Sequence, residues 1–244
     1  MILGSERLKP ELARAIREAL GRDALEGYGT TELSPVVSLN TPKDQVTRDG
    51  KTVPGNRLGT TGLLVPGTLV KTTDPETGAD LARGSEGLIW VKGPQVMLGY
   101  LGRPEATAKV LKDGWYCTGD LGYLDPDGFL KITGRLARFA KIGGEMVPLD
   151  GVEAAISEAA GVAETAVAVV SVPDAKRGER LVVIHTDLGM PTEQVCQKLA
   201  SGDLPKLWLP NAKDYLRVDE MPCLGVGKRD LRRLKEIAAE RLGG

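Results

Sequence analysis

The sequence predicts a protein of mixed α/β and α+β class, with a β-rich unit at about residues 50–135 and a separate α+β domain over 136–244. Two sequence patterns, one before and one after Arg135, predict this. Before residue 135, Gly, Pro and Asp-Gly turns separate short apolar runs such as EGLIWVKG, which is typical of short antiparallel strands. After Arg135, apolar strand-like runs such as TAVAVVSV alternate with segments of helical spacing. That last segment is long enough to form a domain with its own core.

The first expected element is a surface helix in PELARAIREALG, residues 10–21. It places Leu12, Ile16 and Leu20 on one face, and Gly21 can end it. In the β-rich unit, RPEATAKVLKDG predicts one short helix that ends at Asp113-Gly114. The β-rich unit is therefore not purely strands.

The elements expected after Arg135 follow from the same local signals. FAKIGGEMV predicts strand around a glycine pair, and a helix is expected to open at Pro148 and close at Gly161. TAVAVVSV and RLVVIHTDL predict apolar strands. PTEQVCQKLAS and DLRRLKEIAAERL predict two further helices, the second of them at the C-terminus.

Composition excludes several classes of partner. The 244 residues carry 32 Lys+Arg against 33 Asp+Glu, so no basic surface indicates nucleic acid or an anionic membrane. No apolar run reaches the roughly 20 residues of a membrane span, and the N-terminal segment turns charged too early for a signal peptide. We expect a soluble, cytoplasmic chain. Cys117, Cys196, Cys223 and the single His185 are too widely spaced for a disulfide framework or a zinc site.

The stretch GYGTTE, residues 27–32, has the composition of a phosphate and metal site. Gly27 and Gly29 allow a backbone to approach a ligand, Thr30 and Thr31 offer hydroxyls to phosphate oxygens, and Glu32 can bind a hard cation. The alternative is a glycine turn with a capping threonine before a strand.

A second candidate is Asp120 in GWYCTGDLGYLDPDG. It follows a Thr-Gly turn, where its carboxylate can accept hydrogen bonds from a diol such as ribose. Asp125 and Asp127 belong to a predicted hairpin turn and favour a structural role. Arg135 ends a predicted strand and Lys141 follows six residues later; the alternative for each is an ordinary solvated charge.

The third candidate is Lys228, which follows a Gly-x-Gly loop and precedes a helix. Such a loop can present an ammonium group at its tip. It is not a P-loop, because Pro222 stands where the first glycine is required and Arg229 follows the lysine. RLGTTGLLVPG resembles a phosphate-binding loop in its Gly and Thr content. However, no helix is predicted directly after it, so no helix N-terminus would direct backbone amides at an anion.

Taken in order, GYGTTE, GWYCTGD, GRLARFAKIGGEMVPLDGVE and MPCLGVGK resemble the motifs of the adenylate-forming ligase superfamily of acyl-CoA synthetases, luciferases and adenylation domains. The last two are most similar to the ligase half of acyl-acyl carrier protein synthetase/2-acylglycerophosphoethanolamine acyltransferases. The resemblance implies that residues 1–135 are the end of a large AMP-binding domain with a β-barrel-like subdomain, and 136–244 a small mobile C-terminal domain. In the family a long region with a Ser/Thr/Gly-rich phosphate loop precedes GYGTTE. This sequence has no such loop, so we expect the last part of such an enzyme, inactive when isolated.

The resemblance also implies a role for each candidate residue. It implies an ATP/AMP site of Tyr28 against the adenine, Gly29 and Thr30 in the binding loop, Thr31 at the α-phosphate, Asp120 at the ribose hydroxyls with Arg135 beside it, and Glu32 on Mg²⁺. Lys228 would bridge carboxylate and α-phosphate while the acyl-adenylate forms. Lys141 would serve the second half-reaction, and Gly144 would line the phosphopantetheine tunnel. Ala137 occupies the hinge position, where the family usually has Asp or Lys.

The function implied is ATP-dependent activation of a fatty acid to acyl-AMP, followed by thioester formation on acyl carrier protein, favoured here, or coenzyme A. Coupling to lysophospholipid acylation, with the longer protein at the inner membrane, is a further implication of the narrower resemblance. The alternative is a non-catalytic folded fragment or a module that docks a carrier protein.

Overall fold

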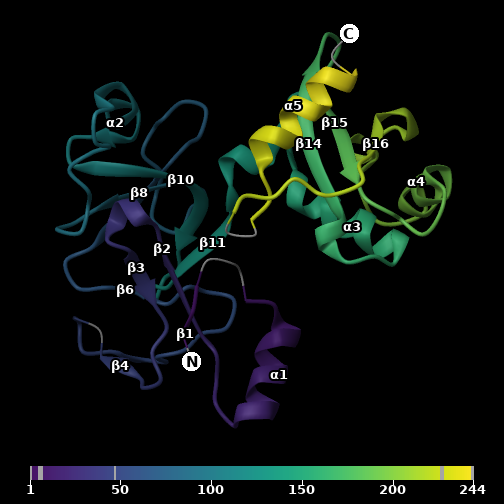
Figure 1. Ribbon diagram of the computed structural model, residues 1–244. Helices are drawn as coiled ribbons and strands as arrows, with labels where there is room; N and C mark the ends of the chain where they lie inside the picture. Colours follow the sequence, from purple (N-terminus) through teal and green to yellow (C-terminus); the bar gives the residue numbers. More distant parts are fainter. Residues whose placement is uncertain (1, 5–7, 47, 226–227, 243–244) are drawn as a thin grey trace. The chain divides into compact units, whose positions relative to one another are not determined.

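The computed structural model describes residues 2–4, 8–46, 48–225 and 228–242. The chain divides into two compact units, Met1–Leu136 and Ala137–Gly244, and each is described by itself. The division falls one residue after the boundary drawn from the sequence. Figure 1 shows helices and strands in both units, and the expected mixed class is confirmed. Among the residues described, no helix is long and apolar enough to span a membrane.

The first unit begins with a small sheet of strand order β1-β2-β3-β6. Its strands are β1 (Ile2–Leu3), β2 (Leu25–Gly29), β3 (Val36–Leu39) and β6 (Leu63–Leu64), and only the β1–β2 pair is parallel. A separate two-stranded pair, β4 (Gln45–Val46) and β5 (Thr52–Val53), follows β3 in the chain. The sheet matters for the site because β2 carries the start of GYGTTE.

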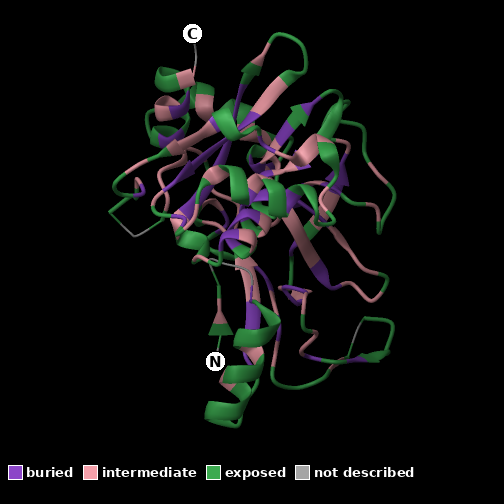
Figure 2. Cartoon of the chain, turned by 90° about the vertical axis from the view of Figure 1, so that its right-hand side faces the viewer, coloured by how far each residue is buried: buried purple, intermediate pink, exposed green. Residues whose placement is uncertain are grey.

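Helix α1 (Pro10–Leu20) forms where it was predicted and ends at Gly21, whose φ of 62° allows the left-handed cap. Its apolar face lies open. Leu12 is 52% and Leu20 is 59% exposed, and Figure 2 shows this helix, next to the N label, almost entirely in the colour of exposed residues. The prediction of a surface helix is therefore confirmed.

The second sheet of this unit is antiparallel, with strand order β11-β10-β8-β7. It contains β7 (Leu69–Thr73), β8 (Gly87–Lys92), β10 (Trp115–Leu124) and β11 (Leu130–Arg135), with β9 (Leu111–Lys112) paired to β10. The core between the sheets consists of Leu33, Val37, Ile89, Val91, Tyr116 and Leu130, all at most 4% exposed.

Helix α2 (Pro104–Val110) is shorter than predicted. The prediction ended it at Asp113-Gly114, but the chain is already extended at Leu111, which pairs with Tyr116 across the β9–β10 hairpin. Asp113 and Gly114 have φ of 52° and 77° and form the turn of that hairpin. Two positive φ angles suit a two-residue turn. Strand pairing therefore ends the helix earlier than its spacing suggested.

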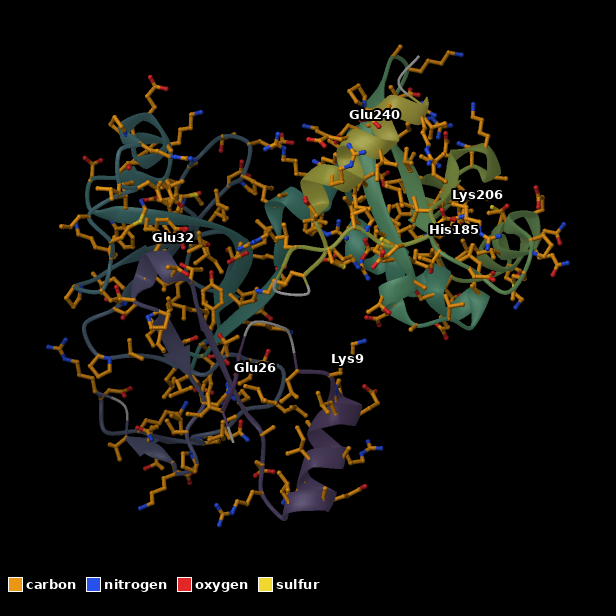
Figure 3. The ribbon with its side chains drawn as sticks, in the orientation of Figure 1. Lys9, Glu26, Glu32, His185, Lys206 and Glu240 are labelled. Atoms are coloured by element: carbon orange, nitrogen blue, oxygen red, sulfur yellow. The ribbon has the colours of Figure 1, made fainter. Side chains whose placement is uncertain are left out.

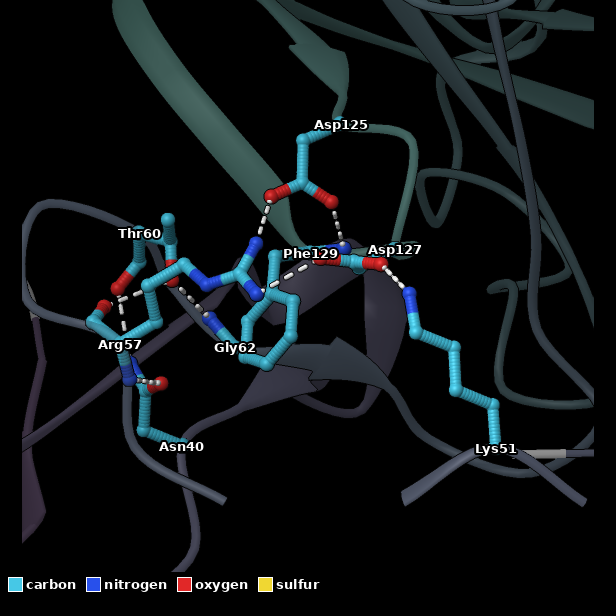
Figure 4. A network of polar contacts seen from close by, with 8 residues as sticks. All are labelled: Asn40, Lys51, Arg57, Thr60, Gly62, Asp125, Asp127 and Phe129. Atoms are coloured by element: carbon cyan, nitrogen blue, oxygen red, sulfur yellow. Dashed lines mark hydrogen bonds and ion pairs between the residues drawn. The ribbon is translucent and has the colours of Figure 1, made fainter. Parts of the chain in front are cut away.

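The turn between β10 and β11 is fastened by charges, as Figure 4 shows. The Arg57 guanidinium donates to Asp125 and, at 2.8 Å, to Asp127, and it lies 4.1 Å from the centre of the Phe129 ring. Lys51 also pairs with Asp127. These contacts give both aspartates the structural role that their place in a hairpin turn predicted.

The second unit has one sheet of order β13-β12-β15-β14, to which β16 adds in parallel beside β15. Its strands are β12 (Phe139–Ile142), β13 (Glu145–Pro148), β14 (Val167–Asp174), β15 (Gly178–His185) and β16 (Tyr215–Arg217), and its helices α3 (Leu149–Ala160), α4 (Thr192–Ala200) and α5 (Leu231–Leu242). The predicted helix between Pro148 and Gly161 is confirmed at both ends.

This unit has two hydrophobic cores, and alternate residues of β14 pack into one or the other. Val167 and Val169 pack in the cluster with α3 and α4, whereas Ala168 and Val170 pack in the cluster with α5. All are at most 1% exposed. Helices thus cover both faces of the sheet, and residues 167–170 of the strand are all apolar for that reason.

Candidate functional site

The GYGTTE stretch is the end of β2 and the 3-10 turn Thr31–Leu33 that follows it. A Cβ built at Gly29 would lie 1.6 Å from the Pro35 carbonyl oxygen, so the backbone itself requires glycine there. This is a structural reason beside the ligand-based one that the sequence suggested. The Thr30 hydroxyl is buried without a hydrogen-bond partner among the described residues, while Thr31 is exposed.

Tyr28, Asp120 and Arg135 come together in the first unit. The Tyr28 hydroxyl donates to Oδ2 of Asp120 at 2.5 Å, and Nε of Arg135 donates to Oδ1 at 2.7 Å. Asp120 is 5% exposed and faces Arg135 directly across the β10–β11 pair. The sequence placed these residues in one site, and the structure joins them through a single carboxylate.

The backbone around Asp120 differs from the predicted Thr-Gly turn. Residues 115–124 are one continuous strand of 10 residues, whose register against β8 shifts between Cys117 and Leu121. Gly119 has φ of 76° at this irregularity, and the Asp120 N–H donates to the Thr118 hydroxyl at 3.1 Å. A bulge therefore aims the carboxylate, because an irregularity inside a strand redirects its side chains.

The electrostatics of this cluster fix the protonation states of Tyr28 and Arg135. Burial, followed by the negative charge of Asp120, raises the pKa of the Tyr28 hydroxyl well above its usual value. The hydrogen bond to Asp120 raises the pKa of Arg135. Tyr28 therefore remains a hydrogen-bond donor and Arg135 a cation at any ordinary pH.

Glu32 is held by Tyr100, a residue that the sequence reasoning missed. The Tyr100 hydroxyl donates to Oε1 of Glu32 at 2.8 Å. Burial alone would raise the pKa of Glu32, but hydrogen bonds from its own backbone N–H and from Tyr100 lower it overall. The only signal for this partner was an aromatic residue in MLGYLGRPE, which lies 68 residues away.

This environment suits a carboxylate that shares a cation with a ligand. Glu32, marked in Figure 3, stays ionised. Within the described residues no three His, Cys, Asp or Glu side chains gather around one point. Mg²⁺ is commonly bound by one or two carboxylates together with substrate phosphates, and Glu32 fits that mode.

In the second unit Lys141 and Gly144 belong to the β12–β13 hairpin. Gly143 and Gly144 have φ of 59° and 90° and form its two-residue turn. The Lys141 N–H donates to Oε2 of Glu179 at 2.5 Å, and Oε1 of Glu179 accepts from Ser171 at 2.7 Å. The hairpin is therefore anchored to the neighbouring strands while its glycine tip stays open, with nothing within 4 Å of a Cβ at Gly144.

Lys228 stands exposed in the segment before α5. Its carbonyl accepts from the Leu224 N–H at 2.6 Å, and Cys223 and Arg229 form an isolated antiparallel bridge. The middle of the predicted Gly-x-Gly loop, residues 226–227, lies outside the described residues. Ala137 is exposed in the 3-10 turn Leu136–Arg138, and it is the first residue of the second unit.

Cys117 and Cys196 are partly buried, whereas Cys223 is exposed. Cys117, Cys196 and Cys223 are free thiols. His185, on β15 (Figure 3), is buried, its ring lies 6.0 Å from that of Tyr215, and Nδ1 contacts the Thr186 carbonyl at 2.8 Å. None of them joins the candidate site residues of its unit through a hydrogen bond in the described structure.

The sequence is similar to one protein family model and to several known ligases. Residues 1–101 match the family model described as AMP-binding enzyme. The chain is 37% identical over 221 residues to a long-chain-fatty-acid–CoA ligase of Yersinia pestis, and 37% identical over 240 residues to one of Bacillus subtilis. These alignments cover 88% and 97% of this chain but 36% and 40% of the two ligases.

Solved structures agree with the sequence relatives. ATP-bound MatB from Rhodopseudomonas palustris has a TM-score of 0.73 and 34% identity, covering 97% of this chain and 44% of that one. The amide bond synthetase McbA from Marinactinospora thermotolerans has a TM-score of 0.68 and 30% identity, covering 97% and 46%. Residues 1–101 belong to the AMP-binding enzyme family of the adenylate-forming superfamily, and the fold of the chain matches the C-terminal part of those enzymes.

The relatives limit how far this assignment reaches. The chain spans well under half the length of the ligases it matches. Their names specify coenzyme A, so the narrower resemblance to acyl-acyl carrier protein synthetases stays a prediction, as do the roles of the individual site residues.

Proposed function

We propose that this chain works as part of an ATP-dependent fatty acid ligase that forms acyl-AMP and then transfers the acyl group to a phosphopantetheine thiol. The observation that carries the proposal is the Tyr28–Asp120–Arg135 cluster. It combines two motifs of the adenylate-forming superfamily in a chain 37% identical to long-chain-fatty-acid–CoA ligases. Fatty acid, ATP and the thiol donor are the substrates proposed.

In this proposal the first unit holds the nucleotide. Asp120 accepts hydrogen bonds from the ribose hydroxyls, and Arg135, which donates to Oδ1, keeps that carboxylate oriented. The Tyr28 ring lies against the adenine, with the 27–32 segment bringing Gly29, the buried Thr30 hydroxyl and Thr31 near the phosphates. Glu32 would hold Mg²⁺, which supplies charge neutralisation at those phosphates when bound.

The second unit supplies the remaining groups. Lys228 places its ammonium where carboxylate and α-phosphate carry developing negative charge, which is how a fixed cation lowers such a barrier. Lys141 and Gly144 act in the second half-reaction, with Gly144 leaving room for the narrow pantetheine arm. Rotation at Ala137 would exchange the two arrangements.

The thiol donor is the finer part of the proposal. The names of the relatives support coenzyme A, whereas the phrasing of GRLARFAKIGGEMV and MPCLGVGK supports acyl carrier protein. We propose acyl carrier protein as the acceptor, with lysophospholipid acylation as the downstream use. Equal amounts of each acceptor in one thioester assay decide between them.

The competing function is a non-catalytic module that folds and docks a carrier protein. The lack of a Ser/Thr/Gly-rich phosphate loop in these 244 residues favours it for the chain alone. The joined Tyr28–Asp120–Arg135 cluster favours catalysis, since a docking module has no use for it.

The test is ATP–pyrophosphate exchange dependent on fatty acid. It is run on the chain alone and on a chimera in which the chain replaces the matching 240 residues of the Bacillus subtilis ligase. We expect no exchange from the chain alone, and exchange from the chimera that Lys228→Ala slows by about 10²-fold or more. A folded chimera that binds ATP yet shows no exchange contradicts the proposal.

A further inference from the structure

A single buried carboxylate in the second unit joins two arginines. Oε1 of Glu153 accepts from the Arg138 guanidinium at 2.5 Å and from the Val169 N–H at 2.7 Å. Oε2 accepts from the Arg229 guanidinium at 2.7 Å. Glu153 is only 6% exposed, so these partners, rather than water, satisfy its charge.

Each arginine directly follows a residue of the proposed mechanism. Arg138 follows Ala137 and is 8% exposed; its guanidinium also donates to Asp150 at 2.7 Å and to the Val169 carbonyl at 3.0 Å. Arg229 follows Lys228, and its second guanidinium nitrogen donates to the Glu164 carbonyl. Planar guanidinium groups with several fixed donors hold their own backbone more rigidly than a lysine in the same place.

The backbone on either side of Lys228 is tied down as well. The Leu224 N–H donates to the Lys228 carbonyl at 2.6 Å, and the Asp230 N–H donates to the Pro222 carbonyl at 2.9 Å. The isolated bridge between Cys223 and Arg229 lies between these two bonds. All of them cross the neck of the loop, and the Arg229 side chain is what connects that neck to the buried Glu153.

We propose that Arg229 is a positioning residue for Lys228, and that Glu153 joins residues 228–230 and the segment after Ala137 into one rigid body through Arg229 and Arg138. Without this anchor the lysine has to be ordered during each adenylation, which costs rate because a catalytic group must be held in place beforehand. The inference rests on the proposed function for its catalytic meaning. The rigidity it describes belongs to the chain itself.

The first test needs no activity. Amide hydrogen exchange is measured on the 244-residue chain with Arg229→Ala, with Arg229→Lys, and with Arg232→Ala as matched control. Arg232 is a neighbouring arginine whose side chain is 91% exposed and pairs only with Glu236 among the described residues. We expect Arg229→Ala to speed exchange at the Leu224 amide by about tenfold or more, as for a loop that opens locally. Arg229→Lys should lie between that variant and wild type, and Arg232→Ala should match wild type.

Amides of β14 and the circular dichroism spectrum show whether each variant is folded. Arg229 is the residue to change because its side chain is 23% exposed, whereas Glu153 is buried and Glu153→Gln also releases Arg138. Unchanged Leu224 exchange in folded Arg229→Ala, or an equal rise in Arg232→Ala, overturns the proposal.

The second test measures adenylation in the chimera defined above. Arg229→Ala should lower kcat about tenfold with little change in the KM for ATP, because it disturbs the lysine and not the nucleotide site. In the Lys228→Ala background the same change should cost nothing further, since the two residues then act as one unit. A full additional loss in the double variant overturns the positioning role. If the unmutated chimera shows no pyrophosphate exchange, the proposed function is refuted instead. The amide hydrogen exchange measurement then tests the rigidity by itself.

Discussion

The Tyr28 hydroxyl donates to Oδ2 of Asp120 at 2.5 Å although 92 residues separate the two in sequence. Arg135 occupies the other oxygen of the same carboxylate. Both oxygens are thus fixed before any ligand arrives, and the remaining lone pairs of Asp120 are directed by its neighbours. Preorganisation of this kind lowers the cost of binding a diol.

Replacing Tyr28 by Phe removes that bond and should destabilise the first unit by about 1.5–3 kcal/mol at pH 7, the range for a hydrogen bond to a charged group. Because the pKa of Tyr28 is raised from 10.0, its contribution is complete below pH 10 and is lost as the pH rises further. Urea unfolding at pH 7 and above pH 10 measures both effects. Tyr123→Phe is the control, since the Tyr123 hydroxyl has no hydrogen bond in the described structure; an equal loss there would contradict the prediction.

Replacing Tyr100 by Phe should act through Glu32. The pKa of Glu32 lies below its usual 4.5, so the stabilisation by Tyr100 is present above that pH and is lost as the pH falls. We expect Tyr100→Phe to cost about 0.5–1 kcal/mol at neutral pH, a modest value because the pair is partly solvated. At acid pH, below that lowered pKa, the difference from wild type should shrink. Chemical denaturation at the two pH values checks this, and a loss independent of pH speaks against it.

Replacing Gly29 by Ala should be far more damaging than replacing Gly21. A Cβ at Gly29 would meet the Pro35 carbonyl oxygen at 1.6 Å, whereas one at Gly21 meets nothing within 4 Å and only its φ of 62° resists the change. We expect about 3 kcal/mol or more for Gly29→Ala and about 1 kcal/mol for Gly21→Ala. Thermal unfolding of both variants tests it. Equal losses would mean that the ligand, and not the Pro35 backbone, is the reason for the glycine.

Replacing Lys228 by Ala in the chimera should slow adenylation by about 10²-fold or more, the scale for loss of one charge-stabilising donor. Transfer from preformed acyl-AMP to the thiol should change much less. The two rates are measured separately by pyrophosphate exchange and by thioester formation. Equal losses in both would indicate general unfolding or another role for this lysine.

Variants that affect only the transfer step should also separate the two half-reactions. Lys141→Ala and a bulky residue at Gly144 should spare adenylation and slow transfer to the thiol. Pro at Ala137 fixes φ near −65° and removes an N–H, so it should impede rotation and preserve only one half-reaction. Rapid-quench measurement of acyl-AMP and thioester distinguishes these cases. Since Gly144 has φ of 90°, the bulky variant needs Gly144→Ala beside it to separate backbone strain from blockage.

Unaltered transfer in all three variants would contradict alternation of the second unit between two working positions. Loss of both half-reactions in Ala137→Pro, with an unchanged melting temperature, would place the pivot at another residue.

The sequence alone determined the elements whose signals are local. Pro148 and Gly161 marked both ends of α3, and Gly21 marked the end of α1, because caps depend on residues within one turn. The hairpin turn around Asp125 and Asp127 was visible for the same reason. The family motifs, which are also short runs, predicted the class of protein.

Only the tertiary structure decided what depends on pairing between distant segments. Strand pairing ended α2 at Val110, and the register of β10 against β8 placed a bulge where a Thr-Gly turn before Asp120 was predicted. The partners of Glu32 and Glu153 stand 68 and 76 residues away in Tyr100 and Arg229. No local pattern encodes such a contact, because it forms only when the packing of whole sheets and helices brings the two side chains together, and the burial that makes it matter arises in the same step.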